Sequence, residues 1–145
     1  MKDIGTTISY NASGPDRFTA LGNTGTVVFF ARTSAATLSL YRTNGLSSGT
    51  VLVMDFASPA TAPEPNIGMM AALGNEAVFF KTGAAGQWEL WKTNGTSSGT
   101  VLVKAVAATS PSGSFSGLPN GLTALPGRVI FSAADTAHGW EVWTS

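Results

Sequence analysis

The sequence lacks cysteine entirely and has one histidine and few charged residues. Without cysteine there is no disulfide framework, no thiolate nucleophile and no cysteine-ligated zinc or iron–sulfur site. Charged residues make up 11% of the 145 positions, and the 8 basic and 8 acidic side chains give a formal net charge of zero. Because such a balance provides no electrostatic footprint for a polyanion, we expect no nucleic-acid partner.

Long apolar runs are also lacking. No 18 apolar residues follow one another, and residues 1–5 do not have the apolar segment of a signal peptide. We therefore expect no membrane partner and no signal peptide in this chain, and the residues alone assign no localisation. Hydrophobic residues nevertheless reach 43% of the sequence, which is enough to build the core of one domain.

An internal repeat organises the chain. Residues 43–53 read TNGLSSGTVLV and residues 93–103 read TNGTSSGTVLV, identical at ten of eleven positions. Further recurring segments are Ala20-Leu21-Gly22, Ala72-Leu73-Gly74 and Ala124-Leu125-Pro126, followed by apolar runs that contain Phe29-Phe30, Phe79-Phe80 and Ile130-Phe131. These recurrences predict one domain of three units, at about 18–56, 70–106 and 122–145.

Short segments rich in Val, Phe, Leu, Thr and Trp, separated by Gly, Asn, Ser and Pro, are typical of strands joined by turns. We predict strands at 18–21, 26–32, 37–43, 50–56, 68–73, 76–81, 87–93, 100–106, 122–125, 128–133 and 140–145. The Asn-Gly pairs at 44–45 and 94–95 can supply positive φ for the turn between the third and fourth strands. The third unit lacks its fourth strand, and residues 1–4 align with 53–56. We expect them to complete that unit, in their own chain or in a neighbour's.

One motif resembles a known family. Residues 89–96 read ELWKTNGT and residues 98–100 read SGT. This pattern resembles the ELWxxDGT repeat of bacterial surface and secreted proteins, with Asn94 where the family usually has Asp. The first unit departs from it at Ser39, Tyr41 and Leu46. The resemblance implies β-propeller blades and a secreted or cell-surface location, and it supplies no catalytic residue.

Two closed architectures fit units of about 50 residues. The favoured one is an all-β fold of three four-stranded propeller-type blades per chain, strand-permuted across the termini. Because a propeller has at least four blades, three blades must join a second chain. The simplest closure is a homodimer with six blades, joined through the N-terminal strand. The alternative is a β-trefoil, in which three such units make a complete monomer.

The sequence offers little for catalysis, so we expect no enzyme and no cofactor. Asp135 and His138 are too few for a metal site, and their segment is typical of a turn. No Gly-x-Ser-x-Gly elbow is present. Glu89 and Glu141 occupy equivalent places at least one blade apart, beyond the roughly 5–10 Å that a glycosidase carboxylate pair tolerates. Pairing of Glu89 and Glu141 with neighbouring blades is the expected role.

Aromatic residues are the strongest binding candidates. Trp88 and Trp140 begin the third strands beside loops that vary between units, whereas Trp91 and Trp143 point to the opposite strand face. Packing is the default role of all four. One hypothesis is a lectin-like module that binds a glycan, with Trp88, Trp140, Asp135 and His138 as candidate ligand-binding residues. The other is a structural or engineered propeller fragment with no small-molecule ligand, and the sequence leaves both open.

Overall fold

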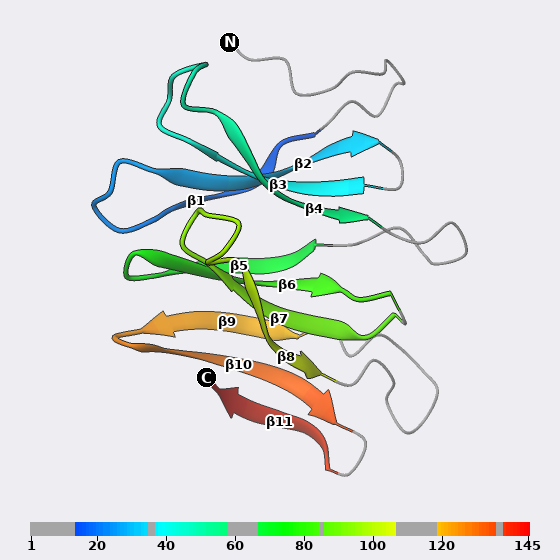
Figure 1. Ribbon diagram of the computed structural model, residues 1–145. Coiled ribbons are helices and arrows are strands. Elements are labelled where there is room, and N and C mark those ends of the chain that lie inside the picture. The colour runs from blue at the N-terminus through cyan, green and yellow to red at the C-terminus, as the bar shows by residue number, and fades with distance from the viewer. Residues whose placement is uncertain (1–13, 35–36, 58–66, 85, 107–118, 136–137) are drawn as a thin grey trace.

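The computed structural model describes residues 14–34, 37–57, 67–84, 86–106, 119–135 and 138–145 (Figure 1). This part of the chain forms eleven strands. It contains no helix, and therefore none that could cross a membrane. Every strand predicted within these residues is confirmed, with ends that differ by at most two positions. The expected strand at residues 1–4 lies outside the described part.

The strands form three antiparallel sheets, each with its strands in chain order. Sheet 1 contains β1 (Asp16–Ala20), β2 (Val27–Ser34), β3 (Thr37–Thr43) and β4 (Val51–Ala57). Sheet 2 contains β5 (Ile67–Leu73), β6 (Glu76–Thr82), β7 (Trp88–Thr93) and β8 (Val101–Val106). Sheet 3 contains β9 (Asn120–Leu125), β10 (Arg128–Asp135) and β11 (Gly139–Thr144). The sheets lie one above another in chain order, with sheet 2 between the other two (Figure 1).

The first strands of the sheets are neighbours, because β1 contacts β5 and β5 contacts β9. The fourth strand forms the far edge of sheets 1 and 2: β4 pairs with β3, and β8 pairs with β7. In sheet 3, β11 pairs with β10, and no described strand pairs with its other edge. The described strands close no barrel, so the trefoil alternative finds no support. The described part of the chain is an all-β stack of three separate sheets.

Strand pairing defines equivalent positions in the three sheets. Phe29 lies opposite Tyr41, Phe79 opposite Trp91 and Phe131 opposite Trp143. Phe131 is therefore the equivalent of Phe79, and Ser132 stands where Phe30 and Phe80 stand in the other sheets. The sequence alignment of Ile130-Phe131 with Phe79-Phe80 is wrong by one residue. Since side chains alternate between faces, this shift moves an aromatic ring from one face of sheet 3 to the other.

The core is divided between the faces of the sheets. Cluster 1 joins sheets 1 and 2 through Leu21, Val28, Phe30, Leu38, Leu40, Val53, Phe56, Ala77 and Phe79. Cluster 2 joins sheets 2 and 3 through Val78, Phe80, Trp88, Leu90, Val106, Val129, Phe131 and Ala133. The same ring pair recurs in both: Phe30 meets Phe79 edge to face at 5.0 Å, and Phe80 meets Phe131 at 5.1 Å. One packing mode is thus used twice.

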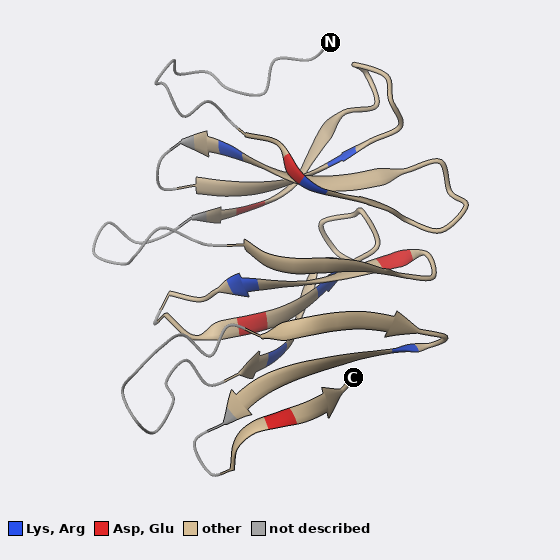
Figure 2. Cartoon of the chain, turned by 180° about the vertical axis from the view of Figure 1, so that it is seen from behind, with Lys and Arg blue, Asp and Glu red and all other residues tan. Residues whose placement is uncertain are grey.

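Charged residues are few and scattered over all three sheets, without a concentration of either sign (Figure 2). The packing of the sheets is accordingly dominated by apolar and aromatic side chains.

Candidate functional site

The outer face of sheet 3 is the face that points away from sheet 2, and we define it by Ile130, Ser132, Ala134, Trp140 and Val142. Trp140 is 53% exposed and Val142 is 79% exposed. The equivalent residues of sheet 2, Trp88 and Leu90, are 9% and 1% exposed because sheet 3 covers them. Those of sheet 1 are buried in the same way under sheet 2. Sheet 3 therefore presents an uncovered copy of a face that is buried twice elsewhere.

The opposite end of the stack is the outer face of sheet 1, which we define by Phe18, Phe29, Ala31 and Tyr41. The three rings form a stacked row, with centroids 5.0 Å apart for Phe18 and Phe29 and 5.7 Å apart for Phe29 and Tyr41. Of the described strands, none lies against this face. Phe29, Ala31 and Tyr41 are at most 9% exposed, whereas Phe18 is 61% exposed.

Pairing in the first strands makes Phe18 the equivalent of Met70 in sheet 2 and Leu122 in sheet 3. Met70 packs against cluster 1 and Leu122 against cluster 2, each on the sheet that precedes its own. Phe18 has no preceding described sheet to pack on. The two ends of the stack thus correspond to the two halves of one repeated interface, of which Phe18 is exposed at sheet 1 and Trp140 and Val142 are exposed at sheet 3.

The structure places the sequence-predicted ligand residues in two different settings. Trp88 lies in cluster 2 between sheets 2 and 3, so its ring faces are covered. Trp140 is exposed on β11, opposite Ala134, and His138 is exposed in the turn between β10 and β11. Asp135 ends β10 opposite Gly139, and its side chain lies outside the described part. Asp135, His138 and Trp140 therefore share one end of sheet 3, and Trp88 does not join them.

A buried ion pair, which the sequence analysis did not anticipate, lies at the interface of sheets 1 and 2. Lys81 Nζ is 2.6 Å from Glu89 Oε2, and the two side chains are 9% and 13% exposed. The same carboxylate accepts hydrogen bonds from Trp91 Nε1 at 2.9 Å and from Gln87 Nε2 at 3.0 Å. The expectation that Glu89 pairs with a neighbouring blade is wrong, because its cation comes from the adjacent strand of its own sheet.

Sheet 1 contributes a ring to this ion pair. Lys81 Nζ lies 5.2 Å from the centroid of Phe56 and 5.1 Å from that of Trp91. At the next interface, Lys104 of sheet 2 lies 4.2 Å from the ring centroid of Trp143. Both interfaces thus place a lysine over the aromatic ring at the Trp91 position. Lys81 is buried, which strengthens its contact, whereas Lys104 is exposed.

We predict that Glu89→Gln lowers the free energy of unfolding by about 1.5–3 kcal/mol, the range for hydrogen bonds to charged groups. Glutamine keeps the shape of the side chain, but it leaves the Lys81 ammonium buried without a counter-charge. Urea denaturation at neutral pH measures the loss. A double variant that adds Lys81→Met should recover much of it, and a loss that stays unchanged in the double variant would contradict the pairing.

Burial raises the pKa of Tyr41 on the outer face of sheet 1, and the nearby negative charge of Asp55 adds to this effect. Ser39 Oγ donates a hydrogen bond of 2.5 Å to Asp55 Oδ1. Ser39 occupies the position of Glu89, so in sheet 1 the carboxylate comes from the fourth strand and not from the third. The ring of Tyr41 therefore lies near the carboxylate of Asp55, just as the ring of Trp91 in sheet 2 lies beside the carboxylate of Glu89.

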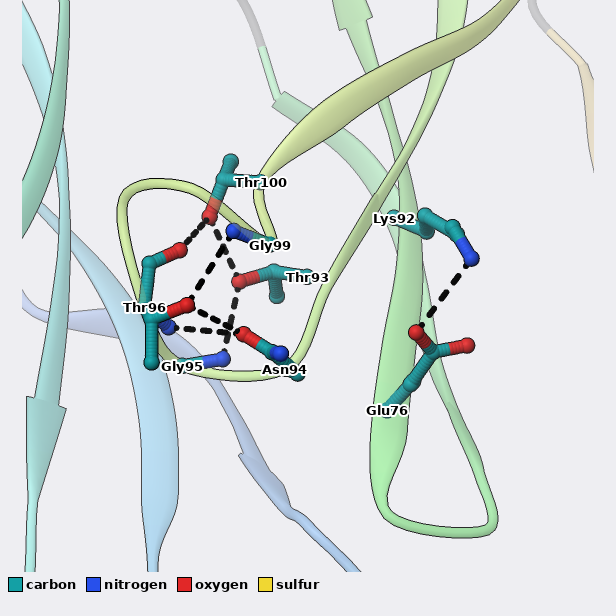
Figure 3. A network of polar contacts seen from close by, with 8 residues as sticks. All are labelled: Glu76, Lys92, Thr93, Asn94, Gly95, Thr96, Gly99 and Thr100. Carbon is teal, nitrogen blue, oxygen red and sulfur yellow. Dashed lines mark hydrogen bonds and ion pairs between the residues drawn. The ribbon is translucent and has the colours of Figure 1, made fainter.

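The turn between β7 and β8 is held by its own side chains (Figure 3). The hydroxyls of Thr93 and Thr100 lie 2.7 Å apart, and Thr100 Oγ1 also donates to the Thr96 carbonyl at 2.7 Å. Asn94 Oδ1 accepts from the Thr96 amide at 3.0 Å. Gly95 has φ +81°, a conformation that glycine adopts without strain. The turn is a compact polar unit built by the repeated TNG and SGT residues.

Thr100→Val is expected to lower the free energy of unfolding by about 1–3 kcal/mol, because it removes the hydroxyl while the partner groups stay buried. Thr93 is 0% exposed and Thr100 is 4% exposed, so water does not replace the lost bond. Thermal and urea denaturation measure the change. The exposed Thr123 offers a matched control, in which substitution by Val should change stability by less than about 0.5 kcal/mol. Equal effects at both positions would contradict this view of the turn.

Within the residues that the structure describes, no three His, Asp or Glu side chains gather as metal ligands. No protein-family model matches the chain, and no curated protein or solved structure is significantly similar to it. What the arrangement can do therefore follows from its own geometry, in which Phe18 at one end of the stack and Trp140 and Val142 at the other are exposed.

Proposed function

We propose that the chain is a non-enzymatic, self-assembling β-propeller module, two copies of which close into a ring of six blades. The observation that carries this proposal is the exposure of Trp140 and Val142, whose equivalents in sheets 1 and 2 are buried by the following sheet. In the ring, the outer face of sheet 3 of one copy packs on the outer face of sheet 1 of the other. A two-fold axis then forms this contact twice and leaves no uncovered blade.

The packing within the chain supports this assembly. Sheet 2 stacks on sheet 1 and sheet 3 stacks on sheet 2 with the same ring contacts, so a further sheet of the same kind fits the next position. Burying the side chains of Phe18, Trp140 and Val142, which are exposed in the single chain, supplies the driving force. The resemblance to ELWxxDGT repeats, which implies propeller blades, agrees with this arrangement.

The edge of sheet 3 supports the assembly as well. β11 holds the place of β3 and β7, each of which pairs with a fourth strand. No described strand pairs with β11 on that side, and an unpaired strand edge is a template for another segment. Residues 1–4 align in sequence with the ends of β4 and β8. We propose that they supply the missing fourth strand, either from the same chain or from the partner copy.

Light scattering across a dilution series tests the proposed assembly. The chain has a mass of 14.9 kDa, so the dimer should scatter as a particle of twice that mass, about 30 kDa. Deleting residues 1–4 should weaken the dimer, because it removes the strand that pairs with β11. A particle of 14.9 kDa at every concentration would contradict the proposal.

The exposed ring of Trp140 favours one second candidate function, glycan binding, in which the indole stacks on a sugar and His138 lies on the adjoining turn. This function needs the outer face of sheet 3 to stay uncovered in solution. A glycan array with the parent protein and Trp140→Ala separates the two functions. If the parent protein binds a sugar and Trp140→Ala abolishes the binding, the lectin-like hypothesis is supported. If the parent protein is a dimer that binds no glycan, the lectin-like hypothesis is excluded.

A further inference from the structure

The turn between β7 and β8 seats against sheet 1, and this contact shows how neighbouring sheets are locked together. A Cβ atom on Gly95 would lie 3.1 Å from Leu21 Cδ1 and 3.7 Å from Val28 Cγ1. Gly95 is itself buried. The turn of sheet 2 therefore packs on a small apolar seat of sheet 1, where a Cβ atom on Gly95 would require Leu21 Cδ1 to shift by a few tenths of an ångström.

The exposed fraction of the leucine in this seat depends on whether a sheet and a turn pack over it. Leu21 is 1% exposed, under both sheet 2 and its turn. Its equivalent in sheet 2, Leu73, lies under sheet 3, which presents no such turn among the described residues, and it is partly exposed. Its equivalent in sheet 3, Leu125, is covered by neither a sheet nor a turn of the described residues and is 39% exposed. Ile130, which pairing makes the equivalent of Val28, is partly exposed beside it.

The turn between β3 and β4 is the equivalent turn of sheet 1, and no described residue packs against its glycine. A Cβ atom on Gly45 would have nothing within 4 Å, although Gly45 has φ +88°, close to that of Gly95. Its internal bonds match those of the seated turn: the hydroxyls of Thr43 and Thr50 lie 2.7 Å apart, and Asn44 Oδ1 accepts from the Leu46 amide at 3.1 Å. The free turn already has the conformation of the docked one, so docking it costs little ordering.

We infer that the β3–β4 turn of one copy docks, through Gly45, on the seat formed by Leu125 and Ile130 of a second copy. The occupant is a second copy because the only turn seen on such a seat in the described residues is the near-identical turn of sheet 2. This inference rests on the proposed assembly and adds one specific contact to it, which we call the lock: the β3–β4 turn of one copy packed on Leu125 and Ile130 of the other. It explains why the turn sequence is repeated almost unchanged at β3–β4, where the described part of the chain offers no seat for it.

The test is Gly45→Asn, measured as the dimer dissociation constant by sedimentation equilibrium. Asparagine tolerates positive φ, so the turn itself can keep its shape while the seat is blocked. We expect the constant to rise at least about tenfold, since a side chain forced into a packed contact is strongly disfavoured. Gly86→Asn is the matched control, because Gly86 has φ +81° and open space around its Cβ position in the β6–β7 loop.

Leu125→Lys provides a second variant, which places a charge in the seat and leaves the turn unchanged. It should weaken the dimer as Gly45→Asn does, while circular dichroism shows that both variants remain folded. A dimeric parent whose dissociation constant is unchanged by both substitutions would overturn the lock and leave the proposed assembly intact. A monomeric parent would overturn the assembly itself, and the lock with it.

Discussion

Trp88→Ala is expected to lower the free energy of unfolding by about 3–5 kcal/mol, the usual cost of removing a buried large aromatic side chain. Trp88 is 9% exposed and belongs to the cluster that joins sheets 2 and 3. Trp140 holds the equivalent position in sheet 3 but is 53% exposed. Trp140→Ala should therefore lower the stability of the single chain by less than about 1 kcal/mol. Urea denaturation measures both values.

These two substitutions form a matched pair, because the same side chain is removed from equivalent places in adjacent sheets. Both are best made in a Val142→Lys background, so that loss of the dimer does not add to the stability difference. Equal destabilisation by the two substitutions would show that the outer face of sheet 3 is covered within the single chain. That result would contradict the exposed face on which the assembly depends.

Val142→Lys is expected to abolish the dimer at micromolar concentration and to leave the fold intact. Val142 is 79% exposed in the single chain, so the lysine is solvated there at little cost. In the assembly the same position would be buried, as Leu40 and Leu90 are at 0% and 1% exposure. A buried ammonium without a partner is strongly disfavoured, which shifts the equilibrium to the monomer. Light scattering measures the loss, and circular dichroism confirms the fold.

Leu102→Lys controls for the added charge. Leu102 is 48% exposed on β8, in sheet 2, both faces of which already pack on other sheets of the same chain. The control variant should remain a dimer. If Leu102→Lys dissociates the dimer as completely as Val142→Lys, then net charge and not the outer face of sheet 3 governs assembly.

The positions of the strands could be predicted because they depend on local residue patterns. Alternating β-branched and aromatic residues, divided by Gly, Asn and Pro, place each described strand within two residues of its observed ends. The Asn-Gly turns likewise have the positive φ expected of them, at Gly45 and Gly95. The repeat then implies that each unit forms the same kind of sheet.

The faces of the strands were harder to predict. Ile130-Phe131 looks like Phe79-Phe80 in sequence, yet pairing of Phe131 with Trp143 shifts the equivalence by one residue. Only the strand partner fixes this register, and a one-residue shift exchanges the two faces. The ion pair of Lys81 and Glu89 was missed for a related reason. Lys81 lies directly opposite Glu89 in the pairing of β6 and β7, and the sequence alone does not supply that register.

The contrast between Trp88 and Trp140 could not be predicted at all. Residues 88–91 read WELW and residues 140–143 read WEVW, so the local patterns are nearly the same. Their exposures differ because a following sheet covers Trp88 and none of the described strands covers Trp140. Burial of a sheet face depends on the sheet that packs on it, which the local sequence does not specify.

Site-specific cross-linking between two copies tests most directly whether sheet 1 of one copy packs on sheet 3 of another. The chain has no cysteine, so Phe18→Cys and Val142→Cys each introduce a single thiol. The equivalents of these residues at the interface of sheets 1 and 2, Met70 and Leu40, pack in one cluster. With a short bismaleimide, a mixture of the two variants should give a covalent dimer and neither variant alone should, because the two-fold ring separates like residues. No cross-link in the mixture, or efficient cross-linking of one variant by itself, would contradict the assembly.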